Sequence, residues 1–188
     1  MRSTILFVPG LRDHVADHWQ TLLAEQTPGS RTVPPLTVNK LDRAARVAAL
    51  DRAVREIAGP IVLVAHSAGC LTLAHWAQRP VTAQIRGALL ATPADIERPL
   101  PEGYPTQAEL EANGWLPAPR GQLPFPSMLC ASANDPLCAR SRAVELANAW
   151  NSLLVDLGKV GHLNPAAGFG PWPRATELIA ALDHGRAA

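Results

Sequence analysis

The sequence contains little charge and no long apolar run, and each absence excludes a class of protein. Only 18% of the 188 residues are Asp, Glu, Lys or Arg, while 47% are hydrophobic, a balance typical of a globular domain rather than a disordered chain. The formal net charge of +1, without a stripe of basic residues, argues against a nucleic-acid partner. The apolar run at residues 5–9 is too short for a signal-peptide core or a membrane span, so we expect no membrane association and a cytoplasmic location.

Cysteine is scarce as well, with only Cys70, Cys130 and Cys138. An odd number of cysteines without metal-ligand spacing does not suggest a disulfide framework or a zinc site. Cys70 and Cys130 lie in apolar runs, which predicts reduced and mostly buried thiols. Because the pattern offers no cluster of metal ligands, we expect neither a metal nor a cofactor.

Short apolar runs alternate with helical patterns along the chain. This alternation is typical of a parallel sheet with helices on both faces, and the nearly continuous apolar runs indicate strands that are buried on both sides. We therefore predict a single α/β-hydrolase domain over residues 1–188, with about six parallel strands and no separate cap domain. The predicted strands cover residues 4–8, 31–38, 60–65, 86–91, 127–131 and 152–157, and the predicted helices cover residues 41–58, 69–78, 106–113, 139–150 and 173–184.

One segment, residues 93–126, interrupts this alternation. It carries eight of the 18 prolines, and within it only residues 106–113 have a helical pattern. A long excursion of this kind is either a functional loop or a rigid loop that covers a sheet edge. Both interpretations stay open on the sequence.

The residues around Ser67 are typical of a serine nucleophile. A buried strand at 60–65 leads into His-Ser-Ala-Gly-Cys at 66–70, so small residues lie two positions before and after the serine. This resembles the nucleophile elbow G-x-S-x-G, whose strained turn exposes the hydroxyl at the carboxyl end of a sheet. Ala65 replaces the first glycine and still meets the requirement for a small residue. A serine that merely caps a helix is the alternative.

An acid and a base follow in the order that this fold requires. Asp135 lies in the loop after the fifth predicted strand, and His162 lies in a glycine-flanked loop after the sixth. Loops at the carboxyl ends of parallel strands gather at one edge of the sheet. We therefore predict that His162 is the base for Ser67 and that Asp135 orients and stabilises the imidazole. Asp95, after the fourth strand, is the weaker candidate for the acid.

The remaining histidines have less defined expectations. His66 is adjacent to the serine in sequence, but strand alternation predicts that its side chain points away from the hydroxyl. His14 and His18 lie in the first loop and are candidates for substrate contact. His75, on a helix, and His184, near the end of the chain, are expected to be structural or solvated.

Backbone amides complete the predicted site. In this architecture the loop after the first strand supplies one donor to an oxyanion, and the residue after the nucleophile supplies the other. We predict the amides of Leu11 and Ala68, with Gly10 allowing the backbone a close approach. For Leu11, an ordinary strand-to-helix turn is the alternative.

Short motifs spread along the chain also carry a resemblance to a known family. They are Val8-Pro9-Gly10, His18-Trp19-Gln20, Val64-Ala65-His66-Ser67-Ala68-Gly69-Cys70, Ala91-Thr92-Pro93-Ala94-Asp95, Ser132-Ala133-Asn134-Asp135-Pro136, Gly161-His162-Leu163-Asn164 and Gly168-Phe169-Gly170-Pro171-Trp172-Pro173. Together they resemble the small serine hydrolases related to retinoblastoma-binding protein 9. The resemblance implies a compact α/β-hydrolase with six parallel strands, the same catalytic triad, and esterase or amidase activity on small substrates. The link of the mammalian namesake to a pocket-protein partner is not carried over, and a protein partner stays unassigned.

The sequence therefore predicts a serine hydrolase that acts on small ester or amide substrates through an acyl-enzyme. An acyltransferase to an acceptor other than water and a non-catalytic binding module are the alternatives. His18, Trp19, Phe169 and Trp172 are candidate substrate contacts in a shallow apolar pocket, although the tryptophans and Phe169 also suit loop packing. No Arg or Asp stands out as a charge anchor, so we expect short, uncharged or apolar acyl groups to be preferred over long chains and dicarboxylates.

Overall fold

Six parallel strands form the centre of the molecule. The computed structural model describes residues 3–185, and its sheet has the order β2-β1-β3-β4-β5-β6, with every neighbouring pair parallel. This confirms the predicted fold class. Because β2 and β3 lie on opposite sides of β1, the strand order reverses between β1 and β3, and ligands bind at such switch points in open α/β sheets. The strands are β1 (Thr4–Val8), β2 (Arg31–Thr32), β3 (Ile61–His66), β4 (Ile85–Ala91), β5 (Ser127–Ala131) and β6 (Leu153–Asp156).

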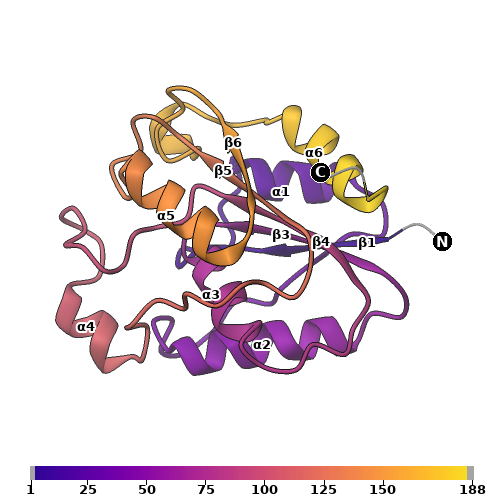
Figure 1. Cartoon of the computed structure of the whole chain (residues 1–188), viewed down its shortest axis with the longest axis horizontal. Helices are drawn as coiled ribbons and strands as arrows, with labels where there is room; N and C mark the ends of the chain where they lie inside the picture. Colours follow the sequence, from indigo (N-terminus) through magenta and orange to yellow (C-terminus); the bar gives the residue numbers. More distant parts are fainter. Residues whose placement is uncertain (1–2, 186–188) are drawn as a thin grey trace.

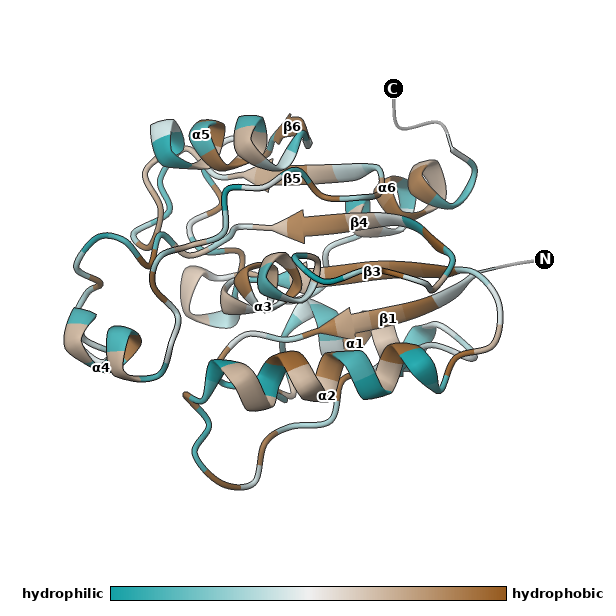
Figure 2. Cartoon of the chain, turned by 60° about the horizontal axis from the view of Figure 1, so that its bottom comes forward, coloured by the Kyte–Doolittle hydropathy of each residue, from teal (hydrophilic) through white to brown (hydrophobic). Residues whose placement is uncertain are grey.

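Helices cover both faces of the sheet and close two hydrophobic cores (Figure 1). Helices α2, α3 and α5 pack on one face, whereas α1 and α6 pack on the other. Strands β3 and β5 are buried along their whole length, and Figure 2 shows the apolar central strands between the helices. The helices are α1 (Trp19–Gln26), α2 (Arg43–Arg55), α3 (Ala68–Trp76), α4 (Gln107–Ala112), α5 (Arg140–Trp150), α6 (Arg174–Asp183) and the short 3-10 helix η1 (Pro165–Ala167).

Two elements differ from the sequence prediction. The second strand was expected over residues 31–38, but β2 ends at Thr32 and the last bond to β1 is donated by the Val33 amide. Prolines 34 and 35 have no amide hydrogen to continue the ladder, so they end the strand at this edge. Helix α1 was not predicted at all. Its N-cap is His18, whose ring nitrogen accepts from the amide of Gln20, and histidine is outside the residue types that normally signal a helix start.

The proline-rich segment 93–126 follows β4 and contains the helix α4, as predicted. A capping box at Thr106 and Glu109 starts this helix. In Figure 1 the segment extends beyond the carboxyl ends of the strands, on the side where the predicted catalytic residues lie. The helices within residues 3–185 include none that is long and apolar enough to cross a membrane.

Candidate active site

Ser67 sits in a strained turn between β3 and α3. Its φ of 55° and ψ of −126° are unusual for a residue with a side chain, and such strain is typical of a nucleophile elbow. The turn brings the start of α3 against β1: a Cβ atom at Gly69 would lie 2.2 Å from the carbonyl oxygen of Val8. The small residue predicted two positions after the serine is therefore required by the contact between two backbone segments.

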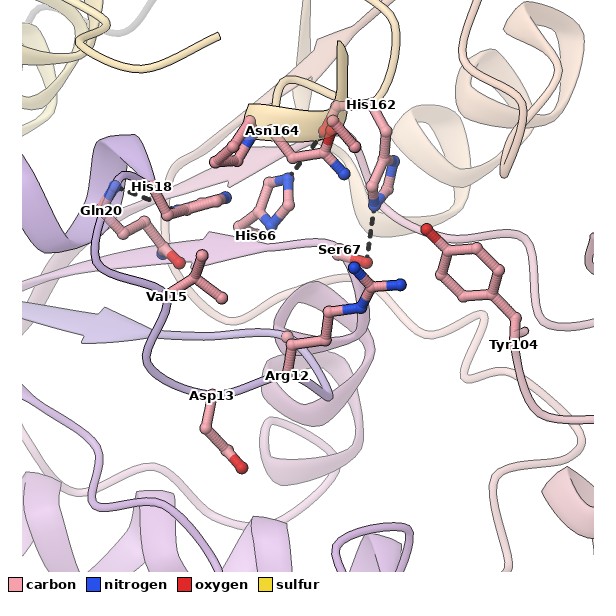
Figure 3. Close-up of a pocket in the computed structure, with 13 residues that line it drawn as sticks. Arg12, Asp13, Val15, His18, Gln20, His66, Ser67, Tyr104, His162 and Asn164 are labelled. Carbon is pink, nitrogen blue, oxygen red and sulfur yellow. Dashed lines mark hydrogen bonds between the residues drawn. The ribbon is translucent and has the colours of Figure 1, made fainter. Parts of the chain in front are cut away.

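The structure brings Ser67, His162 and Asp135 together in one row. The Nε2 atom of His162 is 2.8 Å from the hydroxyl oxygen of Ser67 (Figure 3). On the other side of the ring, Nδ1 lies 3.0 and 2.9 Å from the two carboxylate oxygens of Asp135. The side chains of His162 and Asp135 are almost completely buried, so the carboxylate acts on the imidazole with little screening by water.

The loops that carry the base and the acid are tied to each other. The side-chain oxygen of Asn134 accepts from the amide of Gly161 at 2.8 Å, and the hydroxyl of Ser132 accepts from the amide of Val160 at 3.2 Å. Ser132 also donates to Asn134 at 3.0 Å. These bonds fix the spacing between the ends of β5 and β6, which sets the distance between Asp135 and the imidazole.

His66 supports the backbone of His162, a role that the sequence did not predict. Its Nε2 donates to the carbonyl oxygen of His162 at 2.9 Å, and its ring lies 4.9 Å from the His162 ring. Alternation along β3 predicted only that the side chain points away from the Ser67 hydroxyl. Thr92 donates to the same carbonyl at 3.4 Å. The pKa of His66 is lowered well below its usual value, first by burial and then by His18 and His162. A neutral His66 therefore holds the backbone of the base.

The loop after β1 is held by a buried arginine from α2. The guanidinium of Arg46 donates to the carbonyl oxygens of Gly10 and Leu11 at 3.3 and 3.2 Å, and it pairs with Asp13 at 3.1 Å. Gly10 lies against the nucleophile, since a Cβ atom at this position would be 3.2 Å from the Cβ of Ser67. The loop that carries the predicted oxyanion donor Leu11 is thus fixed beside the start of α3, where Ala68 supplies the second predicted amide.

Two cavities meet at Ser67. A polar cavity of about 120 Å³ is lined by residues that include His162, His18, His66 and Asn164. A larger cavity of about 230 Å³ has mainly apolar walls, most of which come from segment 93–126. This segment is therefore part of the candidate site. The apolar walls are Leu11, Leu41, Ala68, Ala94, Ile96, Leu100, Pro105, Leu110, Trp115 and Leu137.

Arg12 lines both cavities, although no pattern in the sequence indicates a role for it. Figure 3 shows its side chain extended toward Ser67, and its guanidinium carbon lies 5.6 Å from the centre of the Tyr104 ring. Only the turn after β1, with Asp13 donating its amide to Gly10, brings this side chain to the serine. A residue in a loop of unknown geometry gives no sequence signal for such a position.

The predicted aromatic contacts need correction. Trp19 is 1% exposed and packs edge to face with Trp172, with 4.9 Å between their ring centroids. Together with Phe169 they belong to the core beneath α1 and α6, and none of the three lines either cavity at Ser67. Helix α1 explains the difference, because it turns Trp19 toward the sheet. His18 does line the polar cavity, whereas the exposed His14 does not.

With this geometry in place, comparison with known proteins identifies the family. A model of the serine hydrolase family matches residues 5–181. The chain belongs to this family. A YdeN-like hydrolase from Pectobacterium atrosepticum is 30% identical with a TM-score of 0.83, and the match covers 100% of this chain and 94% of that one. None of the curated protein sequences compared with the hydrolase matches it.

Two more distant structures share the fold of this serine hydrolase. The ydeN gene product of B. subtilis is 16% identical with a TM-score of 0.70, and the match covers 96% of this chain and 98% of that one. A thermophilic esterase from Thermogutta terrifontis is 15% identical with a TM-score of 0.60, covering 96% and 88% of the two chains. Both likenesses support the α/β-hydrolase fold.

The serine hydrolase offers no cluster of three His, Cys, Asp or Glu side chains for a metal ion among residues 3–185. Its three cysteines are buried and free, as predicted. Burial raises the pKa of the Cys130 and Cys138 thiols to about 12, so neither is a thiolate nucleophile near neutral pH.

His18 makes the stability of this hydrolase sensitive to mild acid. Its pKa is lowered to about 4, first by burial and then by the neighbouring His162, whereas an unfolded histidine titrates near about 6.5. Between these two pH values the unfolded chain binds a proton that the folded protein does not, so the free energy of unfolding decreases as the pH falls through this window. Urea denaturation at pH 7 and pH 5 should show the decrease.

The variant His18→Asn should reduce this decrease, because asparagine keeps the cap of α1 but does not titrate. The exposed His14 supplies the control, and His14→Asn is expected to lose as much stability between the two pH values as the wild type. An unchanged decrease in His18→Asn would assign the acid sensitivity to other groups.

Proposed function

We propose that this serine hydrolase cleaves small carboxylic esters or amides through an acyl-enzyme on Ser67. The observation that carries the proposal is the position of His162, whose two ring nitrogens contact Ser67 and Asp135 at 2.8 and 2.9 Å. A serine hydroxyl is a weak nucleophile, and this arrangement supplies the base and the orienting acid that it needs. We also propose that the enzyme is related to retinoblastoma-binding protein 9 and its relatives. The same proposal includes a cytoplasmic location and a single domain over residues 1–188.

The reaction proceeds in two steps. His162 removes the hydroxyl proton while Ser67 attacks the carbonyl carbon, and the amides of Leu11 and Ala68 stabilise the oxyanion. His162 then gives the proton to the leaving oxygen or nitrogen, and the bond to the acyl carbon breaks. Water, activated by the same imidazole, releases the acid and restores Ser67. Apart from this water, the steps use only groups of the protein and require no cofactor.

The apolar cavity supports a preference for short, uncharged acyl groups. It is small, at about 230 Å³, and the burial of an apolar acyl chain against its leucine and tryptophan walls is favourable. We expect nitrophenyl esters to show the highest kcat/KM at butanoyl or hexanoyl and lower values at acetyl and decanoyl. A succinyl ester, which brings an anionic acyl group, should be a poor substrate.

A cavity variant sharpens this test. Leu100→Ala removes a half-buried wall of the apolar cavity and should move the optimum toward longer chains. Val38, which is 79% exposed and does not line the cavity, provides the control Val38→Ala with an unchanged optimum. A maximum at decanoyl in the wild type, or selectivity for the succinyl ester, would contradict the proposed acyl preference.

A further inference from the structure

The two cavities at Ser67 differ in chemistry and in their catalytic neighbours. His162 and Asn164 line only the polar cavity, whereas Leu11 and Ala68 line only the apolar one. Ser67, Arg12 and Tyr104 line both. A substrate bound across the serine therefore places chemically different parts in the two cavities.

The proposed mechanism assigns a direction to such a substrate. The leaving atom receives its proton from His162, so the leaving group must lie on the side of the imidazole, in the polar cavity. The carbonyl oxygen must face the amides of Leu11 and Ala68, which places the acyl group in the apolar cavity. The leaving group and the acyl group of the substrate therefore contact different sets of residues.

Arg12 is an exposed residue that brings a positive charge to the junction of the two cavities. Within residues 3–185 no carboxylate forms an ion pair with it. The neighbouring Asp13 is already occupied, since its two carboxylate oxygens lie 3.1 Å from Arg46 and 3.5 Å from Lys40. The Tyr104 ring, 5.6 Å from the guanidinium carbon, helps to hold the side chain between the cavities. The guanidinium is therefore available to a ligand.

His18 adds a hydrogen-bond donor to the same wall. Its Nδ1 atom accepts from the Gln20 amide at 3.2 Å, so the proton of the neutral ring lies on Nε2. This nitrogen is buried and has no hydrogen-bond partner among the described residues, and His18 is 8% exposed. A buried donor without a partner costs free energy, and an oxygen-rich group or a bridging water in the polar cavity would satisfy it.

We infer that the leaving group of the substrate carries a carboxylate that binds Arg12. A single guanidinium matches a singly charged carboxylate, which accepts two parallel hydrogen bonds from it. The substrate class is then an ester or amide of an apolar acid with an alcohol or amine that bears a carboxylate. This inference rests on the proposed function and concerns the leaving group, so it leaves the preference for uncharged acyl groups in place.

Two esters with the same acyl group test the inference. In 3-carboxyphenyl butanoate the leaving phenol is anionic, and in 3-carbamoylphenyl butanoate it is neutral and of similar shape. The wild type should hydrolyse the anionic ester with a kcat/KM about fivefold higher or more, mainly through a lower KM, as expected for a partly exposed ion pair. Added sodium chloride should reduce this ratio by screening the charge.

Substitution of Arg12 tests whether its charge causes the preference for the anionic ester. Arg12→Gln should bring the ratio of the two kcat/KM values to about one, and Arg12→Lys should retain part of the preference. Arg86 is exposed near the start of β4, at the opposite end of the sheet, and Arg86→Gln, which changes the net charge equally, should keep the wild-type ratio. A wild-type ratio of one, or an unchanged ratio in Arg12→Gln, would overturn the role of Arg12.

The same substrates distinguish this failure from failure of the proposed function. If Ser67→Ala stops hydrolysis of both butanoates while the wild type shows no preference, only the inference about the leaving group is wrong. If the wild type hydrolyses neither ester, or if Ser67→Ala hydrolyses both at the wild-type rate, the proposed serine mechanism itself fails, and the inference fails with it.

Discussion

Replacement of Ser67 by alanine should reduce ester hydrolysis by a factor of about 10⁴ or more, because the acyl-enzyme cannot form without the hydroxyl. A fluorophosphonate, which reacts with activated serines, should add one label to the wild type and none to the variant, as measured by intact-protein mass spectrometry. The fold should be retained. Alanine and serine meet the same backbone strain at φ 55°, and among residues 3–185 the hydroxyl has a hydrogen bond to His162 alone.

The exposed Ser141 on α5 provides the matched control. Ser141→Ala should keep both the label and the rate, because this serine lies on the exposed face of α5, outside both cavities at Ser67. Peptide mapping of the labelled wild type should place the adduct on Ser67. A label on another serine, such as Ser132 near Asp135, would contradict the assignment of the nucleophile.

The second large loss of activity is expected on replacement of Asp135, the predicted acid. Asp135→Asn should lower kcat by about 10⁴-fold, because the asparagine amide donates to Nδ1 of His162 and moves the ring proton to Nε2. A protonated Nε2 cannot accept the proton of Ser67. The thermal midpoint should change little by comparison, because asparagine has nearly the shape of the aspartate.

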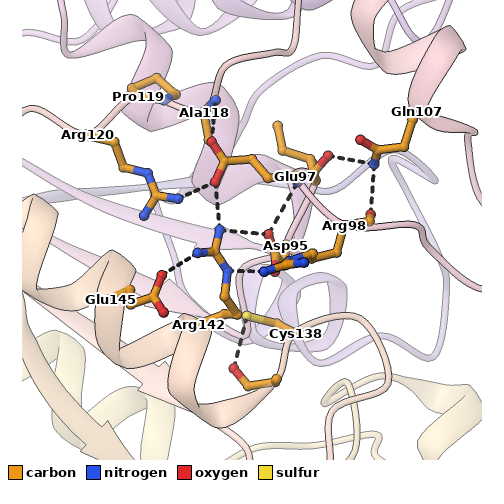
Figure 4. A network of polar contacts seen from close by, with 12 residues as sticks. Asp95, Glu97, Arg98, Gln107, Ala118, Pro119, Arg120, Cys138, Arg142 and Glu145 are labelled. Atoms are coloured by element: carbon orange, nitrogen blue, oxygen red, sulfur yellow. Dashed lines mark hydrogen bonds and ion pairs between the residues drawn. The ribbon is translucent and has the colours of Figure 1, made fainter.

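Asp95→Asn should have the opposite effect: it should lower the stability of the protein and change kcat little. Asp95 is 5% exposed and receives two hydrogen bonds from Arg142, at 2.8 and 3.2 Å, in a network that includes Glu97 (Figure 4). The hydrogen bond to Asp95 is also the main cause that raises the pKa of Arg142. Loss of the aspartate charge leaves this arginine partly unpaired, so we expect a stability loss on the order of 2 kcal/mol and a kcat within a few-fold of the wild type. A larger loss of kcat in Asp95→Asn than in Asp135→Asn would move the acid to the loop after β4.

The residues that the sequence predicted share one property. Ser67 and Asp135 each follow a strand that is buried along its whole length, and His162 follows the partly exposed edge strand β6. The order of strands along the chain therefore placed all three at the same edge of the sheet. Their mutual distances depend on the rigid parallel sheet, which the alternation of strands and helices also predicted. The fold and the row of three side chains were accessible from sequence because both follow from local patterns.

The residues that the sequence missed depend on how loops fold. Arg12 reaches Ser67 through a turn, and Arg46 reaches the same loop from a helix 36 residues after Gly10 in the chain. Strand alternation places His66 on the same face of β3 as Val62 and Val64, near Trp19, but it gives no sign of the bond to the His162 carbonyl, because that contact depends on the fold of the loop after β6. Trp19 was assigned to a pocket because helix α1 has no common cap residue.

The contact of Arg46 with Gly10 has a consequence for the resting state of the enzyme. A trans peptide group is planar, so its carbonyl and its amide hydrogen point in opposite directions. Arg46 binds the carbonyl of Gly10 at 3.3 Å, and the amide of Leu11 in the same peptide group is thereby turned away from the arginine. Rotation of this group would remove one of the acceptors of a buried cation that stays paired with Asp13, and the loss of a buried hydrogen bond is costly. On the proposed mechanism, the oxyanion donor is therefore oriented before substrate arrives, and no rearrangement of this loop adds to the activation barrier.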